Sequence, residues 1–212
     1  MAKYRKILVA YDGSDSAKNA LAVAADLAKK DNSWVKVLAV VPEYDGDLDL
    51  VGISNIKETI QGPGQKLLAE AKKQADELGV HVLANLEQGE PFERIVQIAD
   101  EENCDLIIMG RSGLTHLERE LMGGVTARVI GHTGKHVLVV TEEARLDWHK
   151  ILVAADGSSN SESAVEHAIS AAAEFEGELA VVTVVDANEE MLAMAPEPVS
   201  YTHLTLPTNR EV

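Results

Sequence analysis

The chain has 212 residues, of which 46% are hydrophobic, 25% charged and 4% aromatic. This composition is typical of a globular chain of one or two domains with a core of Ala, Val, Ile and Leu. The formal net charge of -16 repels nucleic acid and anionic membranes, so any phosphate site must be local. Cys104 is the single cysteine, which excludes an internal disulfide and indicates a reducing compartment. Neither a signal-peptide pattern nor an apolar run long enough to cross a bilayer is visible, and we expect a cytoplasmic protein.

Strand and helix patterns alternate along the first two thirds of the chain. Ser14 is expected to cap the first helix, Gly62-Pro63-Gly64 to break the chain before the second, and Gly79 to end it. The apolar periodicity predicts strands at 6–10, 35–41, 80–86, 104–109 and 136–140, and helices at 15–30, 65–78, from 91 to about 99 and 125–130. Continuously apolar strands that alternate with helices predict an α/β fold, an open parallel five-stranded sheet with helices on both faces.

The beginning of the chain is repeated near its end. Lys150–Ala154 repeats Lys6–Ala10, and Asp156-Gly157-Ser158 repeats Asp12-Gly13-Ser14, both at a constant offset of 144 residues. This indicates an internal duplication. We therefore expect a complete domain over 1–146 and a partial second domain of strand, helix and strand over 147–186. We expect residues 187–212 to be disordered, and we interpret 200–212 as a non-native tail, with a flexible native tail as the alternative.

Four glycines surround the junction between the fourth strand and the helix that follows it. They are Gly110, Gly113, Gly123 and Gly124. Glycine permits close approach of the backbone to a ligand, and the first-turn N–H groups of the helix near Gly124 suit a polyphosphate. The pattern favours a phosphate-binding loop, and the alternative is a helix-entry loop that binds nothing.

Two other phosphate motifs do not fit the sequence. The segment Gly131–His136 is similar to the end of a Walker loop, but it lacks the earlier glycine and has His136 where Ser or Thr would meet magnesium. It is more typical of a helix stop at Gly134. A dinucleotide fingerprint needs three glycines after the first strand, whereas Ala10–Ser14 contains one, so an NAD-binding enzyme is disfavoured.

Taken together, Ile7–Ser14 and the glycine pattern from Gly110 to Val125 resemble the universal stress protein family. The resemblance covers residues 3–141 and extends over 148–186 as the opening of a second copy. It implies a Rossmann-like fold of the adenine nucleotide alpha hydrolase-like type and a tandem member that binds ATP. It also implies a nucleotide-sensing regulator of the cellular stress response.

The resemblance also implies where ATP would lie. Asp12 would be near the ribose or a magnesium ion carried by ATP; an Asx turn or helix cap beside Ser14 is the alternative, and both roles are compatible. Gly124 stands where the family pattern commonly has Ser or Thr, and loss of that hydroxyl removes one hydrogen bond of roughly 1.5 to 3 kcal/mol. The implied contacts are Ala10, Asp12 and Val40 for the nucleoside, Met109, Gly110, Arg111 and Gly113 for the ribose and first phosphates, and Gly123, Gly124 and Val125 for the outer phosphates. Arg111 is equally explained as a solvated loop side chain.

The sequence leaves three functions open. We expect binding of ATP or another adenine nucleotide with slow or no hydrolysis, since His116, Glu118 and Glu120 are more typical of a solvated face than of a catalytic site. The alternatives are an interaction scaffold that binds no nucleotide and a weak ATPase. The resemblance further implies a homodimer through the strand Val137–Val140, or pairing with a second domain. The negative charge argues against a nucleic acid or membrane partner.

Overall fold

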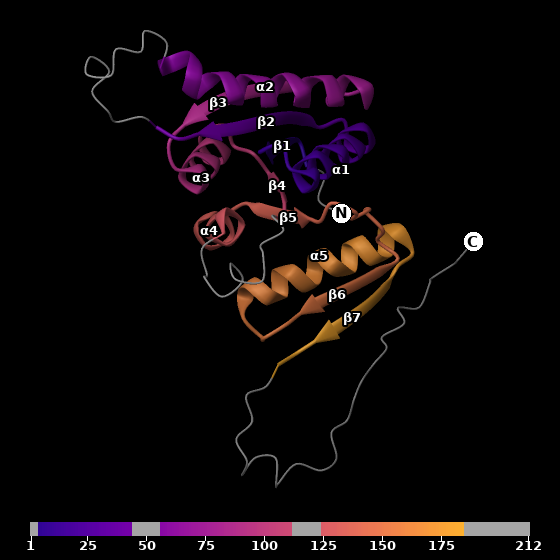
Figure 1. Ribbon diagram of the computed structural model, residues 1–212. Helices are drawn as coiled ribbons and strands as arrows, with labels where there is room; N and C mark the ends of the chain where they lie inside the picture. The colour runs from indigo at the N-terminus through magenta and orange to yellow at the C-terminus, as the bar shows by residue number, and fades with distance from the viewer. Residues whose placement is uncertain (1–3, 44–55, 112–123, 185–212) are drawn as a thin grey trace, which may run out of the picture. The chain divides into compact units, whose positions relative to one another are not determined.

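The computed structural model describes residues 4–43, 56–111 and 124–184 (Figure 1). The chain divides into two compact units, the first over Lys3–Arg145 and the second beginning at Leu146. Gly113, Gly123, His116, Glu118, Glu120 and the segment 187–212 lie outside the described residues.

The first unit is a parallel α/β sheet with helices on both faces, as the sequence predicts. The five strands have the order β3-β2-β1-β4-β5 and every pairing is parallel (Figure 1). Its elements are β1 (Lys6–Ala10), α1 (Asp15–Asp31), β2 (Trp34–Val41), α2 (Ile56–Glu77), β3 (Val82–Gln88), α3 (Pro91–Glu101), β4 (Leu106–Gly110), α4 (Val125–His132) and β5 (His136–Val140).

The two faces of this sheet are covered by different helices. α1 and α2 contact the central strands, whereas a separate core cluster joins α3 and α4 to alternate residues of the strands. Leu8, Leu38 and Ile107 contribute to that cluster from the sheet, and Phe92 and Val129 contribute from the helices. Side chains on a strand alternate between faces, so each central strand is buried on both sides and its sequence is mainly apolar, with Lys36 of β2, which pairs with Glu102, as the buried exception.

The order of the strands places a switch point beside β1. From β1 the chain moves outward to β2 and β3, and it then returns to the other side of β1 with β4 and β5. In open parallel sheets a crevice forms at the carboxyl ends of the two strands where the direction reverses. Here those strands are β1 and β4, and the residues that follow them are Tyr11 to Ser14 and Arg111.

One prediction for α2 is wrong. The helix does not begin after Gly62-Pro63-Gly64 but runs through this segment, with Pro63 inside it. A Cβ on Gly64 would overlap Leu86 and would lie 2.8 Å from Val41 Cγ1, so the helix backbone packs directly on β2 and β3. This packing outweighs the local tendency of Gly and Pro to end a helix.

β3 and β4 each begin two residues later than predicted, because the residues before them form the C-terminal cap of the preceding helix. Gly79, with φ +71°, donates to Asp76 O (2.9 Å), and Val80 donates to Ala75 O (2.9 Å). The same pair of bonds ends α3, where the N–H of Cys104 donates to Ala99 O at 2.8 Å. These are Schellman caps. Cys104 is therefore a buried cap residue and not part of β4, and burial, more than the nearby carboxylate of Glu102, raises the pKa of its thiol.

The second unit repeats β1, α1 and β2 in detail. It consists of β6 (Lys150–Ala154), α5 (Ser159–Phe175) and β7 (Glu178–Val182), and its strands are parallel. The pairing register Lys150↔Glu178 is that of Lys6↔Trp34. Both units therefore close the strand-helix-strand connection in the same way, and the second is a partial copy of the first.

The turns and caps of the two copies also correspond. Ser14 accepts from the N–H of Ala17, and Ser158 accepts from the N–H of Ser161, both at 3.2 Å. Their preceding glycines have φ values of +82° and +79°. The copies differ in what covers the sheet, since Leu152 is 70% exposed whereas its counterpart Leu8 is fully buried.

Candidate functional site

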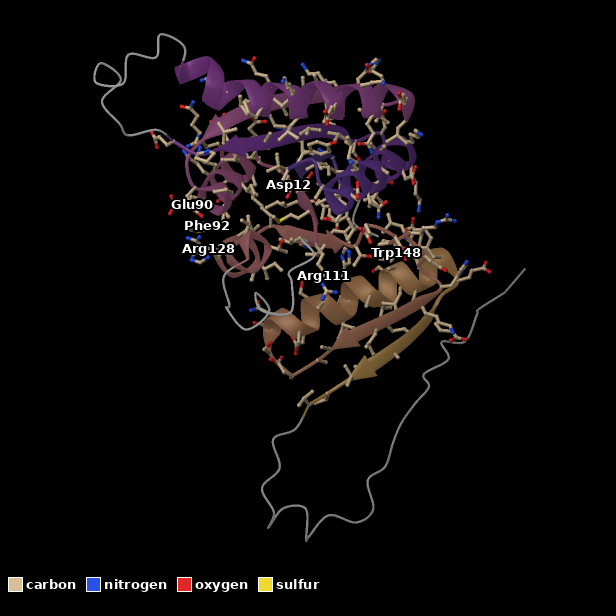
Figure 2. All side chains as sticks on the ribbon, viewed as in Figure 1. Asp12, Glu90, Phe92, Arg111, Arg128 and Trp148 are labelled. Carbon is tan, nitrogen blue, oxygen red and sulfur yellow. The ribbon has the colours of Figure 1, made fainter. Side chains whose placement is uncertain are left out.

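The carboxyl ends of β1 and β4 form the centre of the candidate site. Ala10 at the end of β1 is paired with Met109 of β4. Beyond the strands, the N–H of Tyr11 donates to Leu38 O (2.9 Å) and that of Arg111 to Val140 O (2.7 Å). These two bonds continue the hydrogen bonding of the sheet by one residue beyond β1 and β4. Asp12 and Arg111, both labelled in Figure 2, therefore follow closely on the ends of neighbouring strands.

Asp12 is exposed and forms a turn at the start of α1. Its Oδ1 accepts the N–H of Ser14 at 3.0 Å, which is the Asx turn that the sequence allowed as an alternative. Its second carboxylate oxygen, Oδ2, has no hydrogen-bond partner among the described residues. The turn and a ligand role are therefore compatible, because each requires a different oxygen.

Gly110 has a packing role that the sequence analysis did not foresee. A Cβ at this position would lie 2.6 Å from Ala17 N, Ser16 C and Ser16 Oγ. The end of β4 therefore lies directly against the first turn of α1, and glycine is the residue that permits this approach. The contact holds the ends of β1 and β4 in fixed relation to each other.

The remaining apolar candidates border the α3 and α4 side of the sheet. Ala10, Val40 and Val125 are partly buried and pack against the core cluster on that side. The side chain of Met109 is itself within the cluster and only 4% exposed, so Met109 can reach a ligand through its backbone alone. The structure thus brings Ala10, Val40, Met109 and Val125 to one side of the sheet, whereas Gly110 faces α1 on the other.

The first turn of α4 presents backbone N–H groups that have no partner within the helix. Gly124 is its N-cap residue, with φ -59° and ψ 141°, and makes no side-chain capping hydrogen bond because it has no side chain. The first helical bond is donated by the N–H of Arg128 to Gly124 O at 3.2 Å, so the N–H groups of Val125 to Ala127 have no partner within the helix. These donors lie at the positive end of the helix dipole. The backbone angles at Gly124 suit any residue, so glycine is not required there for conformational reasons.

Three side chains near this turn were missed by the sequence analysis. Arg128 of α4 places Nη1 2.8 Å from Oε1 of Glu90, and its Cζ lies 3.6 Å from the centre of the Phe92 ring. Figure 2 shows the three labels together beside α3 and α4. In the sequence, the one indication of this contact is Glu90, an acidic residue directly before Pro91. The apolar periodicity does not identify Arg128 as its partner.

Neither a metal cluster nor a membrane helix emerges from the part of the chain that the structure describes. Within residues 4–43, 56–111 and 124–184, no three His, Cys, Asp or Glu side chains gather in a way that would hold a metal ion. In the same ranges, each helix is too short or too polar to cross a membrane.

Comparisons with known proteins agree with this fold. A sequence model of the Universal stress protein family matches residues 3–141 and 147–209. The universal stress protein MJ0531 of Methanocaldococcus jannaschii is 36% identical over 144 residues, which span 65% of this chain and 82% of that relative.

Two solved structures carry adenine nucleotides on the same fold. A universal stress protein in complex with cAMP is 27% identical, with a TM-score of 0.55 over 66% of this chain and 98% of that chain. A universal stress protein from Archaeoglobus fulgidus in complex with dAMP is 25% identical, with a TM-score of 0.51 over 65% of this chain and 98% of that chain.

Proposed function

Because the chain belongs to the universal stress protein family, we propose that its first unit binds an adenine nucleotide, and ATP in particular. The observation that carries this proposal is that Asp12 and Gly110 lie at the switch point of the sheet, while Val125 in the first turn of α4 packs on the same core cluster as Ala10 and Val40. Support comes from the complexes of similar proteins with cAMP and dAMP.

The roles follow the resemblance to the family. Ala10, Asp12 and Val40 would contact the nucleoside, Met109, Gly110, Arg111 and Gly113 the ribose and first phosphates, and Gly123, Gly124 and Val125 the outer phosphates. Magnesium carried by ATP would neutralise phosphate charge on a chain with a net charge of -16, and Asp12 would meet it through Oδ2, because Oδ1 accepts from Ser14.

We further propose that the protein acts as a nucleotide-sensing regulator of the stress response with slow or no hydrolysis. The described part of the site offers mainly backbone N–H groups, which bind phosphate but do not transfer protons during the reaction. A scaffold that binds no nucleotide and a weak ATPase are the alternatives.

The test is titration calorimetry of the full chain with MgATP, using a control that the repeat supplies. Asp12→Asn keeps the oxygen that accepts from Ser14 and removes the charge, and we expect about tenfold weaker binding. Asp156→Asn makes the same change in the same turn of the second unit, where Oδ1 accepts from Ser158 at 2.9 Å, and should leave binding unchanged. Absence of binding by the unmodified chain would support the scaffold, and turnover well above background would support the ATPase.

We also propose a homodimer through Val137–Val140, with a second domain as the alternative partner for this edge. β5 is an edge strand of the first sheet, and Val139 is 36% exposed on it. An apolar edge strand offers unpaired backbone groups to a second strand. Light scattering at several protein concentrations checks this, and a monomer at every concentration would contradict the homodimer.

A further inference from the structure

The short helix α4 has few anchors for an element that is to present phosphate donors. It has eight residues, all described, and Val129 alone among them is buried. Val125, one turn earlier, packs against the same core cluster but is only partly buried, so these two apolar contacts do not fully fix the orientation of so short a helix. The direction of the first-turn N–H groups therefore depends on contacts outside the core.

Arg128 supplies such a contact, because it holds α4 to the beginning of α3. Its guanidinium donates to Glu90 Oε1 at 2.8 Å and lies 3.6 Å above the centre of the Phe92 ring (Figure 2). We call Arg128, Glu90 and Phe92 the Arg128 clasp. The ring of Phe92 also contacts His132, at 5.3 Å between ring centres. Arg128 and His132 are four residues apart and so belong to one face of α4.

The two ends of the clasp are held differently. Phe92 is 8% exposed and belongs to the core cluster, so it gives Arg128 a fixed surface. Glu90 occupies the N-cap position of α3, yet its side chain makes no capping hydrogen bond to its own helix. Its carboxylate is directed to Arg128 instead, which neutralises the charge of that arginine.

We propose that the Arg128 clasp sets the orientation of the first turn of α4, so that Arg128 and Glu90 are positioning residues for the outer phosphates of ATP. The inference rests on the proposed function. The backbone N–H of Arg128 closes this turn on Gly124 O, and its side chain ties the same residue to α3. Hydrogen bonds to phosphate weaken steeply when the donor is misdirected, so release of the clasp should weaken binding of the outer phosphates.

A competing explanation is that Arg128 contacts phosphate directly, and the two predict opposite effects of one substitution. Glu90→Gln keeps the shape of the side chain and removes its charge. If the clasp positions α4, this change loosens it and weakens ATP binding. If Arg128 is a phosphate ligand, the same change removes a competing carboxylate and tightens ATP binding.

The experiment is calorimetry of the full chain with MgATP and with AMP, on the unmodified protein and on Glu90→Gln, Arg128→Met and the double variant. AMP lacks the outer phosphates and so serves as an internal reference for the rest of the site. Glu93→Gln removes the same charge from the first turn of α3 and is the matched control. Thermal unfolding by circular dichroism confirms that each variant is folded.

We expect Glu90→Gln and Arg128→Met each to bind MgATP about threefold to tenfold more weakly, with their affinity for AMP unchanged. Glu93→Gln should bind both nucleotides as the unmodified chain does. The double variant should be no weaker than the worse single variant, because both remove one interaction. Tighter ATP binding by Glu90→Gln, equal losses for AMP and ATP, or no change would overturn the inference. If the unmodified chain binds nucleotide and the variants bind MgATP as tightly, the clasp alone is refuted. If the unmodified chain binds neither MgATP nor AMP, the proposed function is refuted and the clasp with it.

Discussion

Gly110→Ala should destabilise the first unit strongly, although it adds a single methyl group. The added Cβ would lie 2.6 Å from Ala17 N, Ser16 C and Ser16 Oγ. Ordinary contacts of a Cβ begin near 3.4 Å, so three atoms at once are too close. Two of them are backbone atoms of α1, which cannot turn aside as a flexible side chain does.

The magnitude follows from this geometry. Overpacking in a core costs typically 1 to 3 kcal/mol, and a clash with backbone belongs at the upper end, about 3 kcal/mol. For a chain of this size the melting temperature falls by about 2 to 4 °C per kcal/mol, which gives a decrease of about 6 to 12 °C. Far-UV circular dichroism during heating measures it.

Gly131→Ala is the matched control, because it makes the same change in α4. No atom of the described residues lies within 4 Å of a Cβ built on Gly131, which is exposed near the end of the helix. Alanine favours the helical backbone over glycine, so this variant should be as stable as the unmodified chain or more stable by up to about 1 kcal/mol. If Gly110→Ala melts within about 2 °C of the unmodified protein, β4 does not lie against α1 as described.

Two further predictions concern the capping residue of α4 and the pH dependence of stability. Gly124→Ser should add the missing cap, raising stability by a few tenths of a kcal/mol and tightening MgATP binding by up to about tenfold, measured by thermal unfolding and calorimetry; weaker binding would contradict the assigned role of this turn. Burial opposes ionisation of Asp105, but the N–H groups of Lys6 and Arg5, at 2.9 and 2.8 Å, outweigh it and lower the pKa of the carboxyl group. Its stabilising contribution is therefore present above the ordinary aspartate pKa of about 4 and is lost as the pH falls through the lower folded value. Asp105→Asn should cost at most about 1 kcal/mol at pH 7 in urea unfolding, with a difference that shrinks on acidification; a difference that grows in acid would refute this sign.

The sheet could be predicted from the sequence because its signals are local. Apolar runs mark β1 and β5 to the residue, and Ser14 is the N-cap that its position before a helical pattern indicates. The predicted first residues of β3 and β4 were wrong for a reason that is also local. Val80 and Cys104 are apolar and belong to Schellman caps, but a search for apolar runs assigns them to the strand that follows.

What the sequence could not predict depends on which elements meet in space. Pro63 lies inside α2 because the helix packs against β2 and β3, and no local pattern states that contact. The glycine pattern indicates Gly110 as a phosphate-binding residue. In the structure, however, α1 packs where a side chain of residue 110 would lie, so this packing already requires glycine. Glu90 and Arg128 are 38 positions apart and of types common on any surface, so only the fold identifies them as a pair.

The correspondence between the two units bears on the order in which this protein folds. β6, α5 and β7 keep the register, serine cap and left-handed cap residue of β1, α1 and β2, although Leu152 lacks the cover that Leu8 has. The strand-helix-strand geometry is thus specified by contacts close in sequence. Such contacts cost little loop-closure entropy and form early, whereas β4 must cross back over the chain to reach β1. During synthesis, β1, α1 and β2 would therefore be assembled before β4 leaves the ribosome, and the candidate site would be completed when β4 and α4 dock on them.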